Sequence, residues 1–127
     1  MSKVFTDVSV FLAAVGQETP SKPTLVETPQ SALYKKLIDE EYAEFIEAWR
    51  DEDDVEKLDA CFDMIWVIVG YMKSRGWDCE NSWDEGAKSN LSKIDPLTGK
   101  VIRRPEDGKI LKPDGWQPPD FSKYVKK

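Results

Sequence analysis

The 127-residue sequence contains no histidine, and this absence removes a large part of ordinary enzyme chemistry. Ser-His-Asp and Cys-His schemes need an imidazole as general base, and the usual zinc sites need it as a ligand. Di-iron carboxylate bundles are disfavoured for the same reason, because they use Glu-x-x-His pairs. Any acid–base or metal chemistry must therefore use carboxylates, lysines or tyrosines.

Cysteine and long apolar runs are also scarce. Cys61 and Cys79 form no Cys-x-x-Cys pair, and Cys61 lies in an apolar helical run, so a reduced, buried thiol is expected there. The longest apolar run, residues 64–72, is far shorter than the roughly 20 residues of a membrane span. The N-terminal segment is interrupted by Asp7 and has helical spacing, which is not typical of a signal peptide. We therefore expect a cytoplasmic protein.

Basic stripes are missing too. The net charge is −6, and no cluster of lysines and arginines alternates with aromatic residues, so a nucleic acid polymer is not an expected partner. A small polyphosphate bound through divalent cations remains compatible, because the metal reverses the local sign of the charge.

Hydrophobic spacing and capping residues predict one all-α domain over residues 1–127, with a helical core at about 5–93. Thr6 or Asp7 is expected to cap the first helix, Ser31 the second, and Asp53 or Asp54 the third. Turn sequences around "KVIRR" and "KILK" predict a small β-hairpin within residues 94–127, followed by an extended tail. The four helices are expected at about 7–15, 31–50, 55–74 and 79–91.

Acidic residues lie unusually close to the apolar faces of the second and third helices. At 100° per residue, Glu41 falls near the centre of the apolar stripe of the second helix, with Glu44 one step away and Glu40 beyond it. On the third helix Asp59 and Asp63 share one face with Trp66, and beyond Asp63 that helix is apolar almost all round. Such a helix in so short a chain predicts a bundle completed by a second subunit.

Carboxylates removed from water cost several kcal/mol unless they are paired or bound to metal. Few basic residues of these two helices lie near the acids, so the pattern favours divalent cations with oxygen ligands, Mg²⁺ or Mn²⁺. The alternative is that the acids form the solvated face of two amphipathic helices.

The segment "EEYAE" (residues 40–44) resembles the EExxE motif of the MazG-like all-α NTP pyrophosphohydrolases. This superfamily includes dimeric dUTPases, dCTP pyrophosphatases and phosphoribosyl-ATP pyrophosphohydrolases. Its second motif, ExxD before an apolar run, is matched at Asp63 in "LDACFDMIWVIVGYM", but Ala60 replaces its glutamate. Asp59 is the substitute we favour for that ligand, and the pair Glu56 and Asp59 is the second choice. The segments "VSVFLAAVGQETPSKPT", "AKSNLSK" and "DGKILKPDGWQPPDF" are also similar to phage and bacterial members, so the resemblance covers nearly the whole chain.

This resemblance implies a four-helix MazG-like bundle, a homodimer or homotetramer, that hydrolyses a (d)NTP to a (d)NMP and pyrophosphate with Mg²⁺. Phosphoribosyl-ATP is the alternative substrate, and an inactive helical dimer that binds nucleotide or a partner is the alternative function, favoured by Ala60. Trp66 is assigned either to stacking on a base or to core packing. The implied roles are metal binding by Glu41, Glu44, Asp59 and Asp63, and substrate binding by Asn90 and Lys93. From their positions we add Glu40 and Glu41 as catalytic residues, and Lys88 and Trp66 as further residues for substrate binding.

Overall fold

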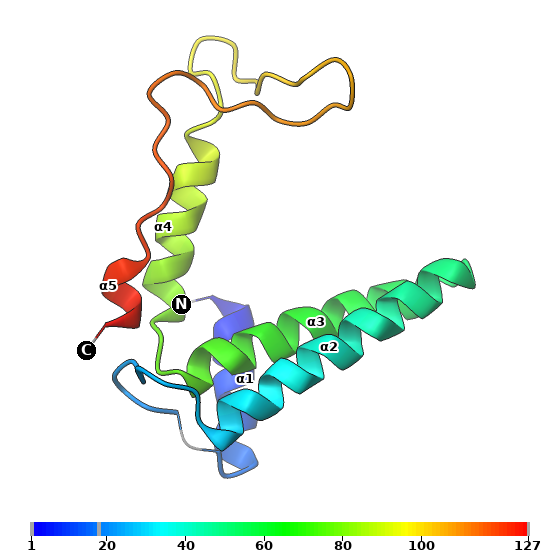
Figure 1. The fold of residues 1–127 in the computed structure, drawn as a ribbon, viewed down its shortest axis with the longest axis vertical. Coiled ribbons are helices and arrows are strands. Elements are labelled where there is room, and N and C mark those ends of the chain that lie inside the picture. Colours follow the sequence, from blue (N-terminus) through cyan, green and yellow to red (C-terminus); the bar gives the residue numbers. More distant parts are fainter. Residues whose placement is uncertain (1, 18, 127) are drawn as a thin grey trace.

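The computed structural model describes residues 2–17 and 19–126 and confirms the all-α class (Figure 1). The four expected helices are present, and a short C-terminal helix that the sequence did not predict follows them. The helices are α1 (Lys3–Ala14), α2 (Pro29–Arg50), α3 (Asp54–Ser74), α4 (Cys79–Leu91) and α5 (Ser122–Val125).

Local capping explains where the helices begin. Helix α2 begins at Pro29, two residues before the expected cap, because Thr28 and Ser31 form a reciprocal capping box. The Ser31 amide donates to Thr28 Oγ1 at 3.1 Å, and the Thr28 amide donates to Ser31 Oγ at 2.8 Å. Helix α1 begins at Lys3, so the predicted caps Thr6 and Asp7 lie inside it. Asp53, one of the two expected caps, does cap α3: its side chain accepts a hydrogen bond from the Glu56 amide.

Helices α2 and α3 form an antiparallel hairpin, and α1 packs on α3 beside it (Figure 1). The close approach of α2 and α3 depends on Gly70, because a Cβ there would lie 2.4 Å from the Tyr34 ring. The Tyr34 hydroxyl donates to Gln17 Oε1 at 2.6 Å, which ties the connector after α1 to this contact. The buried core comprises Phe5, Val8, Leu12, Tyr34, Val67, Val69 and Cys79.

Helix α4 leaves the end of α3 and runs away from the α2–α3 hairpin (Figure 1). The C-terminal tail returns along α4 and is held by hydrogen bonds to its backbone and side chains. Trp116 Nε1 donates to the Ser89 carbonyl at 2.8 Å, and Ser89 Oγ donates to the Gln117 carbonyl at 2.8 Å. One chain therefore does not close a compact four-helix bundle by itself, and completion of the bundle by a second subunit stays a prediction.

The predicted β-hairpin is wrong. Within the described residues, the segment after α4 has a single isolated antiparallel bridge, between Arg103 and Ile110, and no strand. Prolines at 96, 105 and 113 interrupt the segment and remove backbone donors. A two-stranded pairing this short, with no further strand to extend it, does not develop into a ladder.

The apolar surface of α3 is only partly buried within one chain. Phe62 is 55% exposed and Ile65 is 54% exposed, although both belong to the helix expected to be surrounded. None of the described helices is long and apolar enough to cross a membrane.

Candidate metal centre

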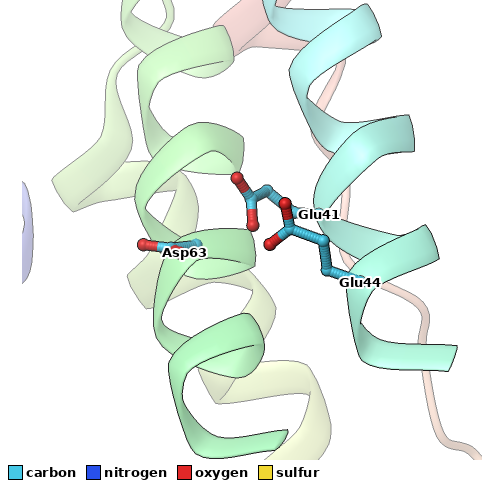
Figure 2. A group of neighbouring side chains, drawn as sticks. All are labelled: Glu41, Glu44 and Asp63. Carbon is cyan, nitrogen blue, oxygen red and sulfur yellow. The ribbon is translucent and has the colours of Figure 1, made fainter. Parts of the chain in front are cut away.

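Three carboxylates meet between the middles of α2 and α3 (Figure 2). Glu41 and Glu44 are three residues apart on α2, so they lie on the same side of the helix and reach toward α3. The antiparallel pairing places Asp63 of α3 opposite them. One oxygen of each carboxylate lies within 4.8 Å of the others.

Burial and mutual repulsion make this cluster electrostatically unfavourable as it stands. Burial raises the pKa of Glu41 from 4.5 to about 7, and interactions with Glu44, Asp63 and Asp59 add to the shift. The pKa of Asp63 is also raised, first by burial and then by Asp59 and Glu44. The cluster therefore has an excess of negative charge that protonation or a cation would relieve.

Among the described residues, no lysine or arginine side chain forms an ion pair with the cluster. Glu41 Oε2 is buried and has no hydrogen-bond partner. The described residues of α2 form one ion pair within that helix, between Lys35 and Asp39. Those of α3 likewise form one, between Lys57 and Asp54. Neither pair includes a carboxylate of the cluster. Three oxygen donors, one of them an unpaired buried atom, fit a divalent cation such as Mg²⁺ or Mn²⁺.

Asp59 and Glu40 lie at the margin of the cluster. Asp59 is near enough for its charge to raise the pKa of both Glu41 and Asp63, but it is exposed and outside the group of three. Glu40 is exposed and also outside this group. Ala60, where the resembling motif has glutamate, is only 2% exposed and offers no ligand.

Trp66 is held by aromatic neighbours on two helices. Its ring centroid lies 5.5 Å from that of Phe11 on α1, in an edge-on arrangement, and 5.7 Å from that of Phe62 on α3. These contacts favour the core-packing role over stacking on a base.

The substrate-binding residues expected on α4 are not brought to the carboxylates within one chain. Lys88 and Asn90 lie in the last turn of α4, and Lys93 follows it, in the part of the helix that points away from α2 and α3 (Figure 1). Lys93 Nζ donates to Asn90 Oδ1 at 3.2 Å and lies over the Trp116 ring, 5.1 Å from its centroid.

Asn90 instead lines a cavity of about 460 Å³ between α4 and the C-terminal tail. The sequence analysis missed this cavity, because α5 and the residues beside it pack on α4 from some 30 positions farther along the chain, and no local pattern signals that contact. Its aromatic lining comprises Trp77, Trp83, Phe121 and Tyr124.

We predict that Mg²⁺ stabilises the protein through these carboxylates. When the free cation concentration is a hundred times its dissociation constant, a cation that binds only the folded state raises the free energy of unfolding by about 2.7 kcal/mol. This is about 10 °C in Tm for a chain of this length. Asp63→Asn should abolish the Mg²⁺-dependent rise in Tm, whereas Asp54→Asn, an exposed change at the start of the same helix, should retain it. Equal rises in both variants, measured by differential scanning fluorimetry, would show that the metal binds elsewhere.

Comparison with known families adds one finding. A sequence model of the family described as phosphoribosyl-ATP pyrophosphohydrolase matches residues 8–90. The matched range includes most of α1, all of α2 and α3, and α4 to its last turn, with all three carboxylates of the cluster. A search of curated proteins finds no match.

Proposed function

The chain belongs to the phosphoribosyl-ATP pyrophosphohydrolase family, and from this premise we propose that it is a metal-dependent hydrolase of nucleoside triphosphates. Its reaction would convert a (d)NTP and water to a (d)NMP and pyrophosphate. The family itself indicates a pyrophosphohydrolase, which acts on phosphoric anhydride bonds. The choice of metal and of substrate is our proposal.

The observation that carries the proposal is the cluster of Glu41, Glu44 and Asp63, which has no cationic partner in the part of the chain that the structure describes. These three residues would hold the metal, with Asp59 as the fourth ligand. When bound, a divalent cation neutralises phosphate charge and favours ionisation of a water molecule. The carboxylates then serve to hold the cation and, through it, the triphosphate.

Proton transfer falls to a carboxylate because the chain has no histidine. We assign this role to Glu40, which adjoins Glu41 in sequence but lies outside the cluster. Glu40 would accept a proton from the attacking water as the new P–O bond forms. The anhydride bond between the α and β phosphates breaks, and pyrophosphate leaves with the electron pair of that bond.

Phosphoribosyl-ATP is the second candidate substrate, and the family match is the observation that favours it. Its hydrolysis breaks an equivalent anhydride bond and also releases pyrophosphate. The N-terminal and C-terminal segments that resemble phage and bacterial MazG-like proteins favour a (d)NTP instead. Ala60 supports a third possibility, a helical dimer without activity.

The test is pyrophosphate release from eight NTPs and dNTPs and from phosphoribosyl-ATP, each with Mg²⁺ and with EDTA. We expect Mg²⁺-dependent release from one or two (d)NTPs and no release with EDTA. Release from phosphoribosyl-ATP alone would replace the substrate while keeping the chemistry. A folded protein that released nothing would support the inactive dimer.

A further inference from the structure

The cavity of about 460 Å³ between α4 and the C-terminal tail has the character of a small-molecule site, and we call it the tail cavity. Such sites typically measure about 300–1,000 Å³ and are lined mainly by apolar and aromatic side chains. Figure 1 shows the tail and α5 running beside α4, and four aromatic residues face the space that they enclose. These residues are Trp77, Trp83, Phe121 and Tyr124.

Two small residues of α4 line the tail cavity on the side of the helix. Gly86 and Ala87 lie in the interior of α4, where glycine is intrinsically unfavourable because of its backbone entropy. A Cβ at Gly86 would lie 3.3 Å from the Phe121 ring, so the missing side chain lets the tail approach the helix. With only a methyl group at Ala87 beside it, this part of α4 leaves room between the helix and the tail.

The two tryptophans of the tail cavity are held by contacts with other parts of the chain. The Trp77 ring meets the Tyr71 ring edge-on, with their centroids 5.6 Å apart, and the Arg75 guanidinium lies 5.0 Å from the Trp77 centroid. The Trp83 ring meets that of Phe5 on α1 edge-on at 6.4 Å, yet Trp83 keeps 65% of its surface exposed. Aromatic area is therefore both fixed in position and accessible, which lowers the cost of binding a ligand.

The tail supplies the remaining side of the cavity and is anchored there. The Asp120 amide donates to Glu85 Oε1 of α4 at 3.1 Å, and Asp120 Oδ1 accepts from the Ser122 amide at 3.0 Å, at the start of α5. Phe121 lies between these two anchors in the sequence and is 44% exposed. A flat ring that entered the cavity would cover exposed area of Phe121 and Trp83, and burial of this apolar surface favours binding.

The polar groups of the lining select the class of ligand. None of the described residues that line the tail cavity is charged, and Ser82, Asn90 and Tyr124 provide neutral hydrogen-bonding groups. Lys93 and Lys123 do not line the cavity, although they contact residues that do. A charged ligand would lose its hydration without gaining an opposite charge in the lining, whereas an uncharged ring with polar atoms at its edge fits this surface.

We propose that the tail cavity binds an uncharged, planar heteroaromatic molecule up to the size of a nucleoside, stacked on the aromatic rings of α4 and the tail. This site is separate from the carboxylates of the candidate metal centre. Met72 is the lining residue closest in sequence to Asp63, and the helical rise places it about 14 Å farther along the axis of α3. Binding at the tail cavity therefore depends neither on the metal nor on the proposed hydrolysis.

Calorimetric titration in EDTA with adenosine, guanosine, cytidine and thymidine tests the proposal without turnover. At least one nucleoside should bind saturably, with one site per chain, and its 5′-monophosphate should bind no more tightly, because the lining has no cationic side chain. Ala87→Leu fills the cavity and Phe121→Ala removes a ring of its wall, so each should weaken binding at least about 10-fold. Two controls should bind like wild type: Ala13→Leu, the same change at an exposed position of α1, and Glu41→Gln at the carboxylates.

Absence of saturable binding by all four nucleosides would overturn the proposal. So would unchanged binding in Ala87→Leu and Phe121→Ala, an equal loss in Ala13→Leu, or a monophosphate that binds at least about 10-fold more tightly than its nucleoside. Loss of binding in Glu41→Gln would place the ligand at the carboxylates instead. Circular dichroism checks that each variant folds, and Phe121→Ala decides the outcome if Ala87→Leu does not fold. A chain without hydrolytic activity would leave these results unchanged, so the two proposals fail separately.

Discussion

Glu41→Gln is expected to lower kcat/KM for pyrophosphate release by at least about 100-fold while leaving the chain folded. Glutamine keeps the volume of the side chain but removes the negative charge at the centre of the cluster. Glu41 is the carboxylate with the most strongly raised pKa and with the unpaired buried oxygen, so the cation would lose its most desolvated ligand. Steady-state kinetics over a range of Mg²⁺ concentrations would measure the loss.

The same substitution should stabilise the protein when no metal is present. The pKa of Glu41 is about 7 in the folded chain against 4.5 for an ordinary glutamate, so the folded state binds its proton more tightly. Folding stability therefore falls as pH rises from about 4.5 to about 7, and the full penalty remains above that range. After allowance for solvent screening at this partly exposed group, the penalty is on the order of 1 kcal/mol.

In EDTA at pH 8, Glu41→Gln should therefore melt about 4 °C above wild type, and the difference should disappear near pH 4.5. Asp39→Asn is the matched control, because Asp39 is an exposed acid of the same helix paired with Lys35. It should change neither activity nor the pH profile. Wild-type turnover in Glu41→Gln would refute the metal assignment, and equal stabilisation by Asp39→Asn would show that only net charge matters.

Gly76→Ala is expected to cause the largest loss of stability, about 3 kcal/mol, or a fall of about 12 °C in Tm. Gly76 follows α3 with a φ of +69°, which is costly for any residue with a Cβ. A Cβ there would also lie 2.1 Å from the carbonyl oxygen of Lys22, so the connector before α2 would have to move. That connector is held beside it by the Thr24 amide, which donates to the Arg75 carbonyl at 2.8 Å.

Gly16→Ala separates the two causes. Gly16 also follows a helix, with a φ of +76°, but a Cβ there meets no atom within 4 Å. Its replacement should cost only the backbone strain, about 1 kcal/mol. Urea unfolding of both variants would measure the difference, and equal losses would show that the contact with Lys22 contributes nothing.

Local sequence determined the helices well because their signals are local. Asp53 caps α3 from the position next to its first residue, and Gly76 follows its C-terminal end. The spacing of Glu41, Glu44 and Asp63 was also readable, since helical periodicity places the acids of each helix on one face. Only the α2–α3 packing decided that Asp63, rather than Asp59, joins the two glutamates, because the register between two helices depends on which side chains interlock, as Tyr34 does over Gly70.

Long-range placement was beyond the sequence. The β-hairpin prediction failed because turn residues specify a bend but not the neighbouring strand that stabilises a ladder. The course of α4 away from the metal centre, and the aromatic cavity formed with Phe121 and Tyr124, depend on contacts between residues far apart in the chain. The sequence alone thus determined the four longer helices and the chemical character of the site. Tertiary structure decided which carboxylates meet, and it left Lys88 of α4 and Lys93 after it far from them, because helix packing and not local propensity sets those distances.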